Sequence, residues 1–244
     1  MNQIVTRVIV VLTALLSVLQ SSFAKEYTPD SSRFEPKQLI APGALITAGA
    51  LCVGIKPLVQ ARKWVNNEIG IHKCAPADDI LQYVPLVGYL GLEYVGVPSR
   101  RPIVDRALKG ATSVIIYAAL TNGLKYSVRE PRPNGRRNSF PSGHSGTAFL
   151  GAELLRQDYG PWAGLAGYTV ATGVGVMRIL NGRHWFNDVL AGAGIGILSA
   201  RCGQWLLPLE RRWLKLDRPG QALIIAPSYS PLTQTATLTA AIII

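Results

Sequence analysis

Two of the three histidines in this 244-residue chain stand in settings that could support catalysis. His184 is followed four residues later by Asp188, and residues with this spacing lie on one face of a helix. A carboxylate that holds one imidazole nitrogen leaves the other as a neutral nucleophile or base. Arg178 precedes the pair, and Asn181-Gly182 predicts a turn between them. An ordinary charge pair along a helix has the same spacing, so the pattern alone leaves both interpretations open.

The second histidine, His144, ends a Pro-Ser-Gly-His sequence that begins at Pro141, just before an apolar stretch. Ser142 is a favourable N-cap for the helix that follows, and Gly143 permits close approach to the backbone. Unpaired amide groups at such a helix start bind anions. The pattern predicts an anion site beside His144, and a plain capped helix with a surface histidine fits it equally well.

Lys125 and Arg132 form a third cluster, seven residues apart, at the end of another apolar stretch. Seven residues are about two helical turns, so both side chains could face one site. Pro131 and Pro133 are expected to end the helix and to fix the approach of the arginine. The alternative is a solvated basic end beside a helix C-terminus, where positive charge is favourable.

In this order, Lys-x6-Arg-Pro, Pro-Ser-Gly-His and Arg-x5-His-x3-Asp resemble the three-part signature of the type 2 phosphatidic acid phosphatase (PAP2) superfamily. This superfamily includes lipid phosphatases, bacterial class A acid phosphatases and vanadium haloperoxidases. The resemblance is tight over residues 125–188 and extends loosely, as alternating helices, over 80–207. One departure is Met177, where the family often has a serine before the arginine, so one hydrogen bond to phosphate is expected to be missing.

The resemblance implies a role for each motif residue. His184 attacks phosphorus to form a phosphohistidine, and Asp188 orients and charges it. His144 protonates the leaving oxygen and then activates the water that releases phosphate. Cations neutralise the phosphoryl charge, so neither a metal nor another cofactor is expected. The expected phosphate-binding residues are Lys125, Arg132, Ser142, Gly143 and Arg178.

The elements that must position these residues are predicted to be helices. Six apolar runs are rich in Gly, Ala and Leu and show few period-2 patterns: 39–55, 80–97, 108–124, 145–155, 162–180 and 187–207. The predicted fold class is all-α, a multi-helix bundle integral to the membrane, with the active site at helix ends on one side. A soluble helical core is the alternative. Strands are expected only in the tail, at 222–226 and 235–244.

Two groups of basic residues indicate the orientation in the membrane, because such residues favour cytoplasmic loops. With both groups inside, the three motifs lie on the outer side. A chain that starts outside reaches this arrangement only if 39–55 does not cross, so an interfacial or re-entrant segment is expected there. The groups are Arg100, Arg101, Arg106 and Lys109, and Arg211, Arg212, Lys215 and Arg218.

The composition and the first residues point to a membrane and to an anionic partner. The formal net charge is +11 and the mean hydropathy is +0.22, and no zinc-ligand spacing or RNA-binding signature supports nucleic acid. Arg7, the apolar run 8–19 and Ser22-Phe23-Ala24 predict a signal peptide over 1–24, with an uncleaved anchor as the alternative. The other expected segments are an N-terminal periplasmic or interfacial segment (25–79), a catalytic helical domain (80–216) and an apolar tail (217–244).

The function that these features favour is a metal-independent phosphatase acting on a phosphomonoester or diphosphate of an anionic membrane lipid. Lipid A, phosphatidylglycerol phosphate, phosphatidate and undecaprenyl diphosphate are the candidate substrates. The expected location is the bacterial inner membrane, with the active site facing the periplasm. The alternatives are a soluble periplasmic non-specific acid phosphatase and, as a weaker hypothesis, a vanadium-dependent haloperoxidase.

Overall fold

The computed structural model of the chain describes residues 33–69, 77–216, 222–230 and 235–243, so the expected signal peptide at 1–24 lies outside the described residues. The described part is a helical bundle, as predicted, and strands occur there only in the tail. The helices are η2 (Pro36–Leu39), α2 (Ile40–Gly54), α3 (Lys56–Ile69), α4 (Asp78–Leu81), α5 (Val84–Gly91), η3 (Leu92–Val95), α6 (Ile103–Val128), α7 (Gly143–Tyr159), α8 (Pro161–Leu180) and α9 (Phe186–Trp213).

The tail forms an antiparallel hairpin of β1 (Ala222–Ser230) and β2 (Thr235–Ile243). Ala222 pairs with Ile243 at one end of the ladder, and Ser230 pairs with Thr235 at the other. The predicted strands at 222–226 and 235–244 therefore correspond to the two observed strands, although β1 continues through Pro227.

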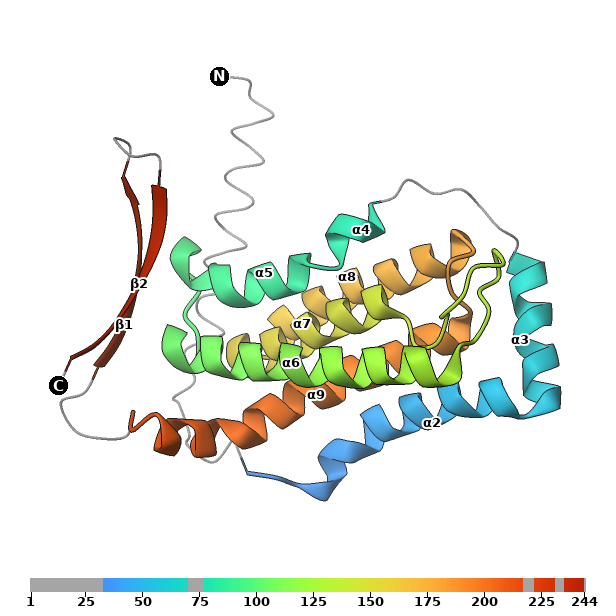
Figure 1. The fold of residues 1–244 in the computed structure, drawn as a ribbon, viewed down its shortest axis with the longest axis horizontal. Coiled ribbons are helices and arrows are strands. Elements are labelled where there is room, and N and C mark those ends of the chain that lie inside the picture. The colour runs from blue at the N-terminus through green and yellow to red at the C-terminus, as the bar shows by residue number, and fades with distance from the viewer. Residues whose placement is uncertain (1–32, 70–76, 217–221, 231–234, 244) are drawn as a thin grey trace, which may run out of the picture.

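Helix α7 lies inside the bundle, in contact with α5, α6, α8 and α9 (Figure 1). Glycines allow α7 and α9 to approach closely. A Cβ atom on Gly196 would collide with the carbonyl oxygen of Gly146, and one on Gly192 would collide with that of Ser142. Small residues at a helix contact bring the two backbones together. This packing fixes the start of α7, which carries His144, against the start of α9.

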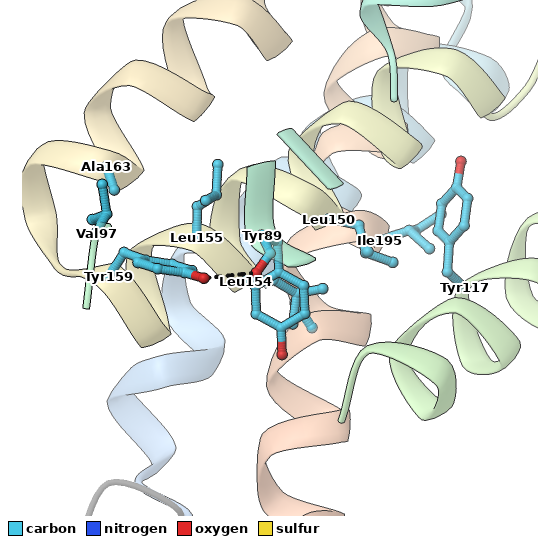
Figure 2. Close-up of a cluster of buried hydrophobic side chains, with 10 residues drawn as sticks. Tyr89, Val97, Tyr117, Leu150, Leu154, Leu155, Tyr159, Ala163 and Ile195 are labelled. Carbon is cyan, nitrogen blue, oxygen red and sulfur yellow. Dashed lines mark hydrogen bonds between the residues drawn. The ribbon is translucent and has the colours of Figure 1, made fainter. Parts of the chain in front are cut away.

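Large side chains from four helices form the main apolar core. Figure 2 shows Tyr89 of α5, Tyr117 of α6, Leu150 of α7 and Ile195 of α9 in this buried cluster. The hydroxyl of Tyr159 donates a hydrogen bond to the carbonyl oxygen of Tyr89 at 3.1 Å, which ties the end of α7 to α5. The core therefore holds α5 against the helices that carry the motifs.

The apolar run 80–97, predicted as one helix, is divided into α4, α5 and η3. Pro85 lies in the first turn of α5, where a proline starts a helix rather than continuing one. Gly96 follows η3 with a φ angle of 91°, a left-handed conformation that favours glycine. The break separates α4 from α5 and allows α4 to contact α7 and α8.

Half of the first basic group belongs to a helix and not, as predicted, to a loop. Arg106 and Lys109 lie in the first turns of α6 and are fully buried. The carboxylate of Asp158 pairs with Lys109 at 2.5 Å and also with Arg101, while Arg106 pairs with Glu93. Carboxylates neutralise these cations, and Arg101, Arg106 and Lys109 are themselves buried. These residues therefore argue less strongly for a cytoplasmic loop than exposed, unpaired cations would.

Helix α2 runs beside α9 along the bundle (Figure 1). Near its start, the indole N–H of Trp205 donates to Oε1 of Gln38 at 2.9 Å; near its end, Nδ2 of Asn187 donates to the carbonyl oxygen of Gly49 at 3.3 Å. The helix thus does not stay at one end of the bundle, as an interfacial or re-entrant segment would. Pro36–Gly54 and Pro161–Leu180 are the two described segments long and apolar enough to cross a membrane.

Candidate active site

The three motifs meet at one end of the bundle, where α6 and α8 end and α7 and α9 begin (Figure 1). Lys125 lies in the last turn of α6, His144 in the first turn of α7 and Arg178 in the last turn of α8. His184 lies just before α9. The predicted arrangement, with all three motifs at helix ends on one side, is confirmed. We call this end of the molecule the reactive end.

His184 and Asp188 are both buried, but the spacing works differently from the prediction. His184 precedes α9, so the two residues do not share a helical face. Nδ1 of His184 lies 3.5 Å from Oδ2 of Asp188 and makes no hydrogen bond within the described part of the chain. Oδ2 instead accepts hydrogen bonds from the hydroxyl of Ser139 and, at 2.9 Å, from the backbone N–H of Trp185. Asp188 is therefore fixed independently of the imidazole.

The environment of His184 keeps its imidazole neutral. Burial lowers the pKa of His184 to about 4; the nearby Asp188 opposes this effect, and the charges of Lys125 and Arg132 add to it. A neutral imidazole is the form that can attack an electrophile. Because Nδ1 faces Asp188, Nε2 is the ring nitrogen on the side away from this carboxylate.

The start of α7 has the predicted N-cap residue but not the predicted cap hydrogen bond. Ser142 is the N-cap and is buried, and its hydroxyl lies 2.9 Å from that of Ser145 instead of bonding an amide of the first turn. Its backbone N–H donates to the carbonyl oxygen of Asp188 at 2.9 Å. Only Cε of Lys125, at 3.9 Å, would approach a Cβ on Gly143, so this glycine leaves open space beside the lysine.

The first-motif cations sit close together and lack carboxylate partners of their own among the described ion pairs. Nζ of Lys125 donates to the carbonyl oxygens of Asn138 at 3.2 Å and Pro141 at 2.9 Å. Burial and the charge of Arg132 lower the pKa of Lys125 to about 8. Burial likewise lowers the pKa of Arg132, and the charge of Arg178 adds to this effect. Like charges held in partial burial favour the binding of an anion between them.

Arg178 is held by two acidic residues that the sequence analysis did not select. Its Nη1 donates to Oδ2 of Asp78 at 2.6 Å and to Oδ1 of Asp79 at 3.3 Å. Asp78 is fully buried, whereas the Asp79 side chain is 46% exposed. The same Oδ1 of Asp79 lies 2.8 Å from Nε2 of His144. The sequence contains one indication of this role: Asp78 and Asp79 are adjacent, just before an apolar run, in a chain with only 14 acidic residues.

A residue of helix α3 anchors the loop that carries Arg132. Arg62 of α3, only 3% exposed, pairs with Glu130 and places its guanidinium 5.0 Å from the centre of the Trp185 ring. The Trp185 indole in turn donates to the carbonyl oxygen of Pro131 at 2.8 Å. Ser139, which bonds Asp188, lies in the same loop. Neither Arg62 nor Ser139 carried a signal in the sequence.

The reactive end places several cationic side chains around the imidazole of His184. Among the described residues, no group of three or more His, Cys, Asp or Glu side chains could hold a metal ion. The available groups can bind a phosphoryl anion, supply a neutral nucleophile and supply a second imidazole for proton transfer.

Three known proteins are similar to parts of this chain. The lipid A 1-phosphatase of Porphyromonas gingivalis is 41% identical over 137 residues, which are 54% of this chain and 31% of that protein. The chain thus spans about a third of the length of this relative. The crystal structure of Aquifex aeolicus LpxE is 21% identical, with a TM-score of 0.46 over 59% of this chain and 93% of that one. A transmembrane PAP2-type phosphatidylglycerolphosphate phosphatase from Bacillus subtilis is 20% identical, with a TM-score of 0.49 over 73% and 99%.

The family model of the PAP2 superfamily matches residues 134–211. This stretch contains the second and third motifs, from His144 to Asp188, together with most of α9. The match agrees with the resemblance that the order of the motifs indicates: residues 134–211 are similar to the PAP2 superfamily.

Proposed function

We propose that the protein is a metal-independent lipid phosphatase that works through a phosphohistidine at His184. The observation that carries the proposal is a buried, neutral imidazole beside partly buried cations at one end of the bundle. Cations placed to neutralise the phosphoryl oxygens are what phosphoryl transfer requires. Arg178, Lys125 and Arg132 serve this role, with the amide of Gly143 and the hydroxyl of Ser142 beside them.

In the first step, the lone pair on Nε2 of His184 forms a bond to phosphorus as the bond to the leaving oxygen breaks. The leaving oxygen takes a proton from His144. In the second step, water attacks phosphorus and gives a proton to His144, while the bond to Nε2 breaks. His184 returns to its neutral form, and His144 returns to the protonated form that the next cycle needs.

The substrate that we propose is a phosphate group on an anionic membrane lipid, and lipid A is the first candidate. The similarity to a lipid A 1-phosphatase supports this choice. Apolar side chains exposed on the outside of the bundle, such as Ile40, Ile115 and Leu165, suit contact with acyl chains and favour a membrane enzyme over a soluble acid phosphatase.

A panel of purified lipids tests the substrate and the mechanism together. The detergent-purified protein should release phosphate from lipid A or from another anionic lipid phosphate, and a brief reaction with radiolabelled substrate should leave label on the protein. His184→Gln should abolish both signals. Phosphate release without any labelled intermediate, even in a rapid quench, would contradict the phosphohistidine. Failure of every lipid would contradict the function.

The location that we propose is the bacterial inner membrane with the reactive end in the periplasm. Exposed basic residues at the opposite end of the bundle, such as Arg100 and Lys215, support it. Single cysteines at exposed Asn134, at the reactive end, and at exposed Arg100 would be tested in a chain without native cysteines. A thiol reagent that reaches only the periplasm should label Asn134→Cys and not Arg100→Cys. The reverse pattern would place the site in the cytoplasm.

A further inference from the structure

Helix α4 brings two adjacent carboxylates to the reactive end, and they have different partners. Asp78 is buried and lies 2.6 Å from Nη1 of Arg178. Oδ1 of Asp79 lies 2.8 Å from Nε2 of His144, 3.3 Å from Nη1 of Arg178 and 4.0 Å from Nη1 of Arg183. The contact with His144 is the shortest of the three. Since Asp78 already balances the charge of Arg178, the arginine does not require the second carboxylate.

The contact between Asp79 and His144 also contributes little to the stability of the fold. Both side chains are partly exposed, and an ion pair in that setting is worth little in free energy of unfolding because water screens it. A stabilising role therefore does not account for a carboxylate placed on the ring of the motif histidine. An effect on the chemistry of that ring accounts for it.

We infer that Asp79 is the positioning residue for His144: it holds Nε2–H and leaves Nδ1 to exchange the proton with the leaving group and with water. This inference rests on the proposed function. The molecule then carries two carboxylate–histidine pairs with opposite orientations. Asp188 faces Nδ1 of the nucleophile, and Asp79 faces Nε2 of the acid–base residue.

The charged groups around His144 explain why it needs a carboxylate. Arg178, on α8, faces the ring, and Asp78 and Asp79 face it from α4, with Arg183 behind Asp79. Burial and the charge of Arg178 lower the pKa of His144, and the two carboxylates oppose them. The general acid must hold a proton when the substrate is bound, so a carboxylate on the far nitrogen keeps the ring charged and turned toward the reaction.

The first experiment compares leaving groups in the Asp79→Asn variant. An alkyl phosphate such as the lipid needs a proton on its leaving oxygen, whereas p-nitrophenyl phosphate does not. We expect kcat to decrease by about 10-fold or more with the lipid, a part of what a general acid supplies, and much less with p-nitrophenyl phosphate. The matched control is Asp78→Asn, which disturbs Arg178 and should impair both substrates alike. Equal losses with both substrates for Asp79→Asn, or no loss, would overturn the inference.

The second experiment does not depend on turnover. The three histidines are titrated by NMR in detergent micelles, with His144 assigned by its loss in His144→Gln. Replacing the Asp79 carboxylate by an amide should lower the pKa of His144 and leave that of His184 unchanged. An unchanged His144 titration would overturn the pairing. If no substrate is hydrolysed by the unmodified protein, the proposed function fails while this measurement still decides the pairing.

Discussion

Both ends of the bundle contain clusters of basic side chains, but the partners of these side chains differ between the ends. At the far end, Arg101 and Lys109 share the buried carboxylate of Asp158, and Arg106 pairs with Glu93. At the reactive end, Lys125 bonds only backbone carbonyl oxygens in the hydrogen bonds described, and Arg132 is surrounded by other cations.

The difference separates a structural use of charge from a functional one. The far-end cations and their carboxylate partners hold helices together. Arg178 at the reactive end is also paired, with Asp78 and Asp79, so the contrast concerns Lys125 and Arg132. Cations held close together without such partners destabilise one another until an anion binds. Substitutions at the far end should therefore change stability, and substitutions at the reactive end should change activity.

The largest effect is expected for His184→Ala. No neighbouring group can replace the nucleophile, so kcat should decrease by at least about 1,000-fold. The unfolding midpoint should change little, because burial disfavours the protonated form of this ring and Asp188 keeps its bonds to Ser139 and Trp185. The measurement pairs turnover with thermal unfolding in detergent. Substantial residual turnover would remove His184 from the mechanism.

A smaller loss of activity is expected for Arg132→Ala. Removing one group that stabilises developing charge costs about 100-fold or more in rate. The variant should be at least as stable as the unmodified protein, because one member of a cluster of like charges is removed. Arg132→Lys serves as the control and should recover part of the rate. A decrease in stability with unchanged kcat would place this arginine among the structural cations.

Asp158→Asn is the matching substitution at the far end. It leaves Arg101 and Lys109 without their shared carboxylate, and breaking a buried pair in this way costs about 3–5 kcal/mol in free energy of unfolding. Activity per folded molecule should remain close to that of the unmodified protein. Adding Lys109→Met should restore part of the stability. Unchanged stability with lost turnover would contradict the division between the two ends.

The smallest effect concerns the pH dependence. Lys125, with its pKa lowered to about 8, is charged below that pH and loses its charge above it, so kcat/KM should show a further decrease above about pH 8, in addition to the decrease that loss of the His144 proton causes at lower pH. His184, with a pKa of about 4, stays neutral across the same range and should add no step above about pH 5. In Lys125→Arg the decrease should move to higher pH. An unmoved alkaline step would assign it to another group.

The sequence predicts the helical bundle and the meeting of the three motifs at helix ends, because both follow from patterns along the chain. Apolar runs define the spans, and the order of Lys125, His144 and His184 along the chain identifies the residues of the reactive end. Local patterns cannot show which residue from a distant element completes a site. Asp79 reaches His144 across 65 positions of the chain, and Ser139 reaches Asp188 across 49.

The predicted helix limits are less accurate where polar residues are buried in pairs. The apolar run 108–124 omits the first turn of α6, because Arg106 looks like a solvated residue in the sequence. Its partner on η3, Glu93, helps to make it part of a buried helix. The spacing of His184 and Asp188 was similarly misleading, since a helix start and not a helical face brings them together.

The direction of α2 determines on which side of a membrane the start of the described chain lies. Counting α2, α5, α6, α7, α8 and α9, the chain passes between the two ends an even number of times, so residue 33 and residue 216 lie on the same side of any membrane that the bundle spans. Residue 33 is then always opposite the reactive end. A leader that delivers residue 33 to the periplasm would turn His184 toward the cytoplasm, and a periplasmic His184 requires residue 33 to stay inside. A labelling measurement at Arg33 therefore reports both the side of the membrane on which residue 33 lies and the side on which the reactive end lies.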